Sequence, residues 1–235
     1  MKKLLFFVFA VLAILGCGGD GVENLPCFDG DCDDPPPSSG GSLSYGGQSY
    51  KTVVIGRQTW MAENLNYNPG TGSSACYGNQ ASSCNTYGRL YDWATAMALP
   101  PNCNYDYCSS QIQSRHRGIC PSGWHIPSND DWDVLINYAG GSETAGRYLK
   151  ATSGWNSYDG VSGNGTDQYG FSALPGGFGY SDGSFYNVGY YGNWWSASEN
   201  SSNIAYNRNM FYYNDYAYWN SNLKAYLLSV RCIQD

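Results

Sequence analysis

Residues 128–139 read SNDDWDVLINYA and decide the fold class of the chain. Ser128 can cap a helix, Asp131 can return the hydrogen bond three residues on, and acids in a first turn favour the positive end of the helix dipole. Apolar residues then recur at helical spacing, and Gly140-Gly141 ends the pattern. The apolar positions are Trp132, Leu135, Ile136 and Ala139. The segment therefore predicts a helix with one buried face.

Short β-rich runs lie on both sides of this helix. Residues 50–55 and 58–61 are separated by Gly56-Arg57, which predicts a hairpin. After Thr152 the chain is rich in Gly, Ser, Asn and Tyr and has no long apolar period. A second short helix is predicted at 143–150, and further strands at 194–198, 205–213, 217–219 and 227–233. We predict an α+β fold with two short helices, a mainly antiparallel sheet and long Gly/Asn/Tyr-rich loops.

Composition agrees with a loop-rich β protein and argues against nucleic acid as a partner. The 235 residues include 30 glycines and 22 tyrosines, and only 13% of residues are charged. The formal net charge is −7. A basic face able to neutralise phosphates is therefore not expected.

The N-terminus has the features of an export signal. Lys2 and Lys3 precede an apolar run at 4–15, which is shorter than the roughly 20 residues of a membrane span. Gly16-Cys17 after this run resembles the lipobox of bacterial lipoproteins, although Leu15 is larger than usual there. The resemblance implies a signal peptide at 1–16 and acylation of Cys17, which anchors the chain to a lipid bilayer. The alternative is an ordinary cleaved signal that leaves Cys17 as a spare thiol.

The residues after Cys17 predict a tether and then one domain. Residues 35–37 are three prolines and residues 38–42 read SSGGS, a stiff piece followed by a flexible one. We assign residues 17–44 to the lipidated cysteine and a disordered tether, and residues 45–235 to the domain. Gly18 stands where an inner-membrane retention signal would place Asp, which favours the outer membrane or cell surface of a Gram-negative cell.

Seven blocks of sequence stand out along the domain. They are YKTVVIG at 50–56, QTWMAENL at 58–65, YGRLYDW at 87–93, CPSGWHIPS at 120–128, GFSALPGG at 170–177, WWSASE at 194–199 and SVRC at 229–232. In this order, the blocks resemble the Fibrobacter succinogenes major paralogous domain family. The resemblance implies an extracytoplasmic module, often on a lipoprotein, with no established activity. It also implies a layout similar to the C-type-lectin-like fold, of the variety shared with formylglycine-generating enzymes.

Eight cysteines remain when Cys17 is set aside, and an even number in an exported chain predicts disulfides. Cysteine spacing favours three short disulfides and leaves one long one. A long bridge of this kind is common in lectin-like domains. Eight cysteines permit 105 connectivities, so other pairings remain open. Formylglycine-generating enzymes hold a closely spaced reactive pair, and Cys103-x4-Cys108 has a similar interval; we prefer structural disulfides. The predicted pairs are Cys27–Cys32, Cys76–Cys84, Cys103–Cys108 and Cys120–Cys232.

The sequence offers little for catalysis, and we predict that the protein is not an enzyme. His116 and His125 are the only histidines, which makes a zinc site hard to assemble. His125 is expected to be buried and hydrogen-bonded. No nucleophile elbow or phosphate-binding loop occurs, and Asp130-Asp131 is better explained as the acidic start of a helix.

A structural calcium ion is the one cofactor considered. Lectin-like domains often hold calcium through oxygen ligands in the long loop region, but the Glu-Pro-Asn and Trp-Asn-Asp signatures of calcium-dependent sugar binding are absent. The candidate ligands are Asp159, Asn164, Asp167 and Asp182.

Aromatic residues interleaved with Asn, Ser and Gly are the main candidates for binding. Tyrosine supplies rigid amphipathic area, and the small polar residues supply adaptable hydrogen bonds. Part of this aromatic content must fill the core, where we expect Trp124, Trp194 and Trp195. Alternate tyrosines along 205–219 should face outward. The candidate ligand-binding residues are Tyr206, Tyr212, Tyr216, Tyr218, Trp219 and Asn220.

The leading hypothesis is a lipid-anchored cell-surface binding or adhesion module, for polysaccharide or a protein ligand. The alternative is a structural surface lipoprotein that packs against envelope partners through the same aromatic face. A third hypothesis is an enzyme related to formylglycine generation.

Overall fold

The computed structural model describes residues 38–235, which lie within one compact unit. The predicted signal peptide, Cys17, the tether as far as residue 37 and the Cys27–Cys32 pair fall outside the described residues. Within residues 38–235, no helix is long and apolar enough to cross a membrane.

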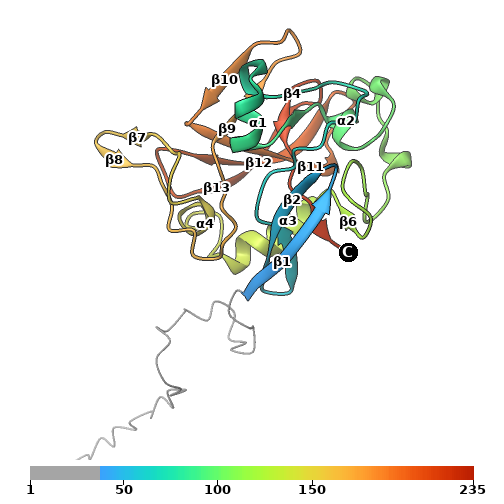
Figure 1. Cartoon of the computed structure of the whole chain (residues 1–235). Coiled ribbons are helices and arrows are strands. Elements are labelled where there is room, and N and C mark those ends of the chain that lie inside the picture. The colour runs from blue at the N-terminus through green and yellow to red at the C-terminus, as the bar shows by residue number, and fades with distance from the viewer. Residues whose placement is uncertain (1–37) are drawn as a thin grey trace, which may run out of the picture. The chain divides into compact units, whose positions relative to one another are not determined.

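Two sheets and two small hairpins form the β part of the fold (Figure 1). Every strand pair is antiparallel except β11–β14, which confirms the prediction of a mainly antiparallel sheet. The first sheet has the order β1 (Ser38–Tyr45), β2 (Gln48–Ile55), β3 (Gln58–Met61), β15 (Ile233–Gln234) and β6 (Trp124–His125). The second has the order β13 (Ala217–Leu223), β12 (Ile204–Phe211), β11 (Tyr191–Glu199), β14 (Leu228–Ser229), β5 (Leu90–Tyr91) and β4 (Ser74–Ala75). The hairpins are β7 (Ser157–Tyr158) with β8 (Val161–Ser162), and β9 (Gly176–Gly179) with β10 (Phe185–Val188).

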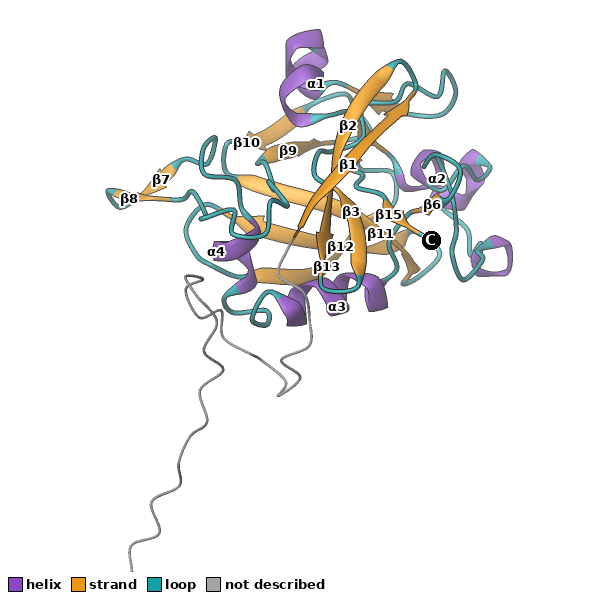
Figure 2. Cartoon of the chain, turned by 60° about the horizontal axis from the view of Figure 1, so that its bottom comes forward, coloured by secondary structure: helices purple, strands orange, loops and turns teal. Residues whose placement is uncertain are grey.

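Four α-helices are present in the described residues, where the sequence predicted two (Figure 2). The predicted helices are α3 (Asn129–Tyr138) and α4 (Ala145–Leu149); the missed ones are α1 (Ala81–Tyr87) and α2 (Trp93–Ala96). Helix α1 buries only Cys84, so it has no apolar periodicity to detect. Helix α2 is a single turn that begins where the Asp92 carboxylate accepts from the Thr95 amide at 2.7 Å. Three one-turn 3-10 helices also occur: η1 (Tyr77–Asn79), η2 (Pro101–Asn104) and η3 (Ser109–Gln111).

Helix α3 begins as predicted. The Ser128 hydroxyl accepts from the Asp131 amide at 3.2 Å, and the Asp131 carboxylate accepts from the Ser128 amide at 2.8 Å, which completes the capping box. Its apolar residues Trp132, Leu135 and Ile136 are buried. The Trp132 ring lies 4.9 Å from Trp60 and 6.4 Å from Trp194, so α3 joins the cores of both sheets.

His125 is buried and hydrogen-bonded, as expected. Its Nδ1 lies 2.7 Å from Asp235 Oδ1, and its Nε2 lies 3.4 Å from Asp131 Oδ2. Burial lowers the pKa of His125, but the hydrogen bonds to both carboxylates outweigh it, so the net pKa is raised. The imidazole therefore joins the start of α3 to the end of β15.

Several predicted boundaries differ from the structure, and two of the differences change the topology. Strand β1 begins at Ser38, inside the stretch assigned to the tether, because backbone pairing with β2 needs no apolar side chains. The strand predicted at 227–233 is divided into β14 and β15, which belong to different sheets. The chain crosses between the sheets at Val230-Arg231, both of which are buried.

A buried polar cluster around Asn64 holds this crossing in place. Asn64 Oδ1 accepts from Arg231 Nη2 at 2.7 Å, from Arg231 Nε at 3.1 Å and from Trp194 Nε1 at 2.8 Å. Asn64 Nδ2 donates to the Tyr87 carbonyl at 2.8 Å. The Arg231 guanidinium also donates to the Phe171 carbonyl and lies 4.2 Å from the Phe171 ring centre. Burial lowers the pKa of Arg231 to about 9, so it remains a cation at neutral pH.

The three disulfides in the described residues are those the sequence predicted. Cys76–Cys84 and Cys103–Cys108 close short loops, while Cys120–Cys232 joins residues 112 apart in sequence. The long bridge fixes the chain before β6 to the chain before β15. It therefore closes the first sheet covalently.

The long bridge is expected to stabilise the fold much more than a short one. By loop entropy, Cys120→Ala with Cys232→Ala should lower the free energy of unfolding by about 5 kcal/mol, and Cys76→Ala with Cys84→Ala by about 2.5 kcal/mol. Urea unfolding of the two double variants measures both losses. Equal losses would contradict the central role given to the long bridge.

Candidate binding surface

Strand β12 presents different chemistry on its two sides. Asn207, Asn209 and Phe211 alternate with Tyr206, Arg208 and Met210. Arg208 donates through Nη2 to the Asp133 carboxylate on α3, so the Arg208 side of the sheet faces that helix. The Asn207 side is the opposite face, which we call the amide face.

Asparagine side chains join three strands across the amide face. Asn222 Nδ2 on β13 donates to Asn207 Oδ1 on β12 at 3.0 Å, and Asn207 Nδ2 donates to Asn209 Oδ1. Asn209 Nδ2 then donates to Asn193 Oδ1 on β11, and Asn193 Nδ2 donates to the Gly177 carbonyl at 3.2 Å. Asn193, Asn207 and Asn209 are buried. The row satisfies its own polar groups and therefore supports the sheet.

Eight aromatic rings form a continuous cluster where these strands end, beside the β7–β8 hairpin; we call it the aromatic cluster. Ring-centre distances of 4.8–5.9 Å connect every member to at least one other. Tyr158, Tyr190, Tyr213 and Tyr216 are exposed. The members are Tyr158, Tyr190, Tyr191, Phe211, Tyr212, Tyr213, Tyr216 and Tyr218.

Lys150 positions the turn that carries much of this cluster. It is 1% exposed at the end of α4, and its Nζ donates to the carbonyls of Phe211 at 3.3 Å and Asn214 at 2.9 Å. Helix α4 also packs closely on the turn at Gly146, where an added Cβ would lie 2.5 Å from the Tyr216 carbonyl oxygen. The cluster is thus presented by a supported turn.

The Tyr213 phenol can donate a hydrogen bond at neutral pH. Burial raises the pKa of Tyr213, and the neighbouring phenols raise it further. A protonated phenol offers a donor beside a flat apolar ring. Such a surface can bind ligands that combine hydroxyl oxygens with flat C–H faces.

The six predicted ligand-binding residues do not share one surface. Tyr212, Tyr216 and Tyr218 belong to the aromatic cluster, and Asn220 lies on the amide face. Tyr206 and Trp219 form a separate ring pair, 5.4 Å apart, on the Arg208 side of the sheet. The β12–β13 register places Trp219 opposite Arg208. The sequence predicted a strand at 217–219 but not its register, so it could not show on which side of the sheet Trp219 lies.

Several cluster members were absent from the predicted site. Tyr158 and Phe211 are separated by 53 residues, and only tertiary structure brings them into one network. The supporting role of Lys150 also has no local sequence signal. The available indication in the sequence was the Gly/Ser/Asn/Tyr-rich composition of the chain after Thr152.

Three of the four candidate calcium ligands accept hydrogen bonds from residues nearby in the fold, and the fourth, Asp159, is exposed. Asp167 accepts from the Ser172 amide and hydroxyl, and Asp182 accepts from the Ser184 amide and hydroxyl. Asn164 Oδ1 accepts from the Trp155 amide, and Asp159 lies at the exposed turn between β7 and β8. Among residues 38–235, no three His, Cys, Asp or Glu residues are grouped so that they could hold a metal ion.

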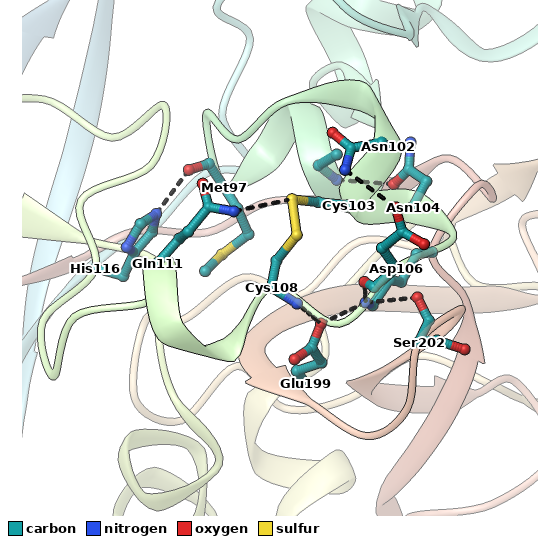
Figure 3. The surroundings of a disulfide bond; sticks show 12 residues. Met97, Asn102, Cys103, Asn104, Asp106, Cys108, Gln111, His116, Glu199 and Ser202 are labelled. Atoms are coloured by element: carbon teal, nitrogen blue, oxygen red, sulfur yellow. Dashed lines mark hydrogen bonds and ion pairs between the residues drawn. A yellow bond between two sulfur atoms is a disulfide. The ribbon is translucent and has the colours of Figure 1, made fainter.

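Cys103 and Cys108, the pair considered for redox chemistry, form a buried disulfide (Figure 3). The Cys108 amide donates to Glu199 Oε1 at 2.9 Å. The disulfide joins Cys103 in η2 to Cys108, the residue just before η3.

The asparagine row is expected to be structural. Asn209→Ala removes the hydrogen bonds that Asn209 makes with Asn207 Nδ2 and Asn193 Oδ1. Both groups are then buried without that partner, so the free energy of unfolding should fall by about 2–3 kcal/mol. Asn220→Ala is the matched control because Asn220 is exposed and should change stability by less than about 0.5 kcal/mol. Urea unfolding measures both, and an unaffected Asn209→Ala would contradict a supporting role for the row.

Comparison with known proteins identifies the family. The Fibrobacter succinogenes major domain matches residues 53–234. No curated protein and no solved structure matches the chain. The match covers nearly all of the folded unit, including the residues that meet at Asn64 and Arg231. The chain therefore belongs to the Fibrobacter succinogenes major domain family.

Proposed function

We propose that this chain is a lipid-anchored cell-surface binding module that holds polysaccharide on the aromatic cluster. The observation that carries the proposal is the set of exposed tyrosines, Tyr158, Tyr190, Tyr213 and Tyr216, within one connected ring network. Exposed aromatics that are fixed by their neighbours lose little side-chain freedom when a ligand binds. A net charge of −7 also favours a neutral ligand over an anionic one.

The proposal includes a C-type-lectin-like layout. The pairing of β15 with β3 and the Cys120–Cys232 bridge support it, because both bring the end of the domain beside its beginning. Export to the outer membrane or cell surface, with acylated Cys17 in the bilayer, is part of the same proposal and is supported by the sequence of residues 1–18. The disulfides agree with an oxidising compartment.

Polysaccharide binding is expected to depend on individual cluster tyrosines. Tyr213→Ala and Tyr216→Ala should each weaken retention on insoluble cellulose, xylan or mannan by about tenfold, the effect of losing one anchoring aromatic. Depletion of the oxidised protein from solution by each polymer measures the affinity. Both side chains are exposed, so the variants should remain folded.

Two controls make this experiment specific. Tyr105→Ala removes a more exposed tyrosine outside the cluster and should leave retention unchanged, and Trp219→Ala tests the other side of the sheet. Retention should also survive a chelator, because the described residues lack an acidic metal cluster. Failure of the wild-type protein to bind any of the polymers would remove the polysaccharide proposal and favour the structural lipoprotein.

A further inference from the structure

Strand β13 is an outer strand of the second sheet, and it lacks the features that usually protect such an edge. Its sequence, AYWNSNL, contains no charge and no proline, and its register with β12 is continuous from Ala217 to Leu223. The other outer strands of the two sheets differ. Strands β4 and β6 are two residues long, and β1 has a register shift between Ser39 and Ser42. A long, regular and uncharged edge is open to pairing with another strand.

The backbone groups of β13 point away from β12 at alternate residues. The Ala217 amide donates at 2.8 Å to the Ser142 carbonyl, which lies outside the sheet, whereas the Lys224 amide donates to the chain that enters β12. Because N–H and C=O directions alternate along a strand, the backbone groups of Trp219 and Ser221 point to the open side. The Ser221 amide donates to the side chain of its neighbour Asn220 at 2.8 Å, in an exposed position. These two residues therefore offer backbone donors and acceptors to an incoming strand.

The side chains of β13 favour a second copy of the same strand. The asparagine row of the amide face ends here, with Asn222 bonded to Asn207 and with Asn220 exposed beside it. An asparagine amide both donates and accepts, so Asn220 can pair with the same residue of another copy. On the other side of the strand, Trp219 is 64% exposed and lies 5.4 Å from the Tyr206 ring centre. Both sides of the strand are therefore self-complementary.

Charge agrees with this choice of partner. The chain has a net charge of −7, so two copies repel one another where their acidic surfaces approach. Strand β13 carries no charge, and the Lys224 ammonium that follows it is buried and paired with Glu199. Arg208, opposite Trp219 in the register, is paired with Asp133. Two copies can thus approach along β13 without bringing like charges together.

We propose that two copies of this chain associate through β13, antiparallel about a two-fold axis at Asn220, so that their second sheets become one. This register sets Trp219 opposite Ser221 of the second copy, which are the residues whose backbone groups point outward. Asn220 then faces Asn220 of the second copy, and the two Trp219 side chains lie diagonally within reach of one another. A contact of this kind uses the same surface twice, so the assembly closes at two copies. It requires no ligand and does not depend on polysaccharide binding.

Cysteine cross-linking tests the register. In the proposed pair, the two Asn220 Cα atoms lie about 4.5–5.5 Å apart, within the span of a disulfide. Asn220→Cys should therefore form a covalent dimer under mild oxidation. Leu223→Cys is the matched control: Leu223 is exposed on the same strand, but its two copies lie about 20 Å apart and should not cross-link. Non-reducing electrophoresis measures both beside the wild type, and equal cross-linking of the two variants, or none in either, would overturn the proposal.

A pair of variants at Ser221 tests the backbone hydrogen bonds. Ser221→Pro removes the outward amide, which proline tolerates at a sheet edge, whereas Ser221→Ala removes the hydroxyl and keeps the amide. Analytical ultracentrifugation of the oxidised protein should show a reversible dimer for wild type and Ser221→Ala, and a dissociation constant at least tenfold higher for Ser221→Pro. Urea unfolding checks that Ser221→Pro is folded; if it is not, the Asn220→Cys result decides. Equal dissociation constants for the two variants, a wild type that is monomeric at every concentration, or assemblies larger than two copies would overturn the proposal.

Discussion

The hydrogen bonds between Asn64 and Arg231 are the constraint on which the rest of the structure depends. Arg231 lies where the chain crosses from β14 in one sheet to β15 in the other, and it is fully buried. A buried guanidinium is tolerated only when its donors have acceptors, and Arg231 donates to Asn64 Oδ1 and to the carbonyls of Phe171 and Ser172. Asn64 also accepts from Trp194, so the two sheets and the loop at 171 are fixed relative to one another through a few polar atoms.

This polar cluster gives a structural role to the sequence blocks that carry the family resemblance. Asn64, Phe171, Trp194 and Arg231 come from four different sequence blocks that carry the resemblance, and in the folded chain they meet in the interior. The shared sequence thus describes a scaffold. The surface proposed for binding, the aromatic cluster, lies outside these blocks, at strand ends and in the turns that the scaffold positions. Lys150 supports this surface by donating to the Phe211 and Asn214 carbonyls from a buried position.

Features encoded locally could be predicted from sequence, and features that depend on tertiary contact could not. The capping box of α3, the β2–β3 hairpin and the two short disulfides follow from neighbouring residues or close cysteine spacing. The long disulfide was predicted as the pair that remained after the short bridges were assigned. The division of residues 227–233 between two sheets depends on Arg231 finding Asn64, 167 residues away in sequence. The same applies to the separation of Trp219 from the tyrosine cluster, which requires the β12–β13 register, and to the pairing of Glu199 with Lys224.

We propose that the buried residues around Asn64 and Arg231 hold the fold while the aromatic cluster contacts the ligand. Hydrogen–deuterium exchange of the oxidised protein, with and without soluble xylan or mannan, tests this most directly. We expect added protection in peptides covering the β7–β8 hairpin and the turn after β12, with no change around Asn64 and Arg231, which are already buried. Protection confined to the α3 side of the sheet, or the absence of protection anywhere, would contradict it.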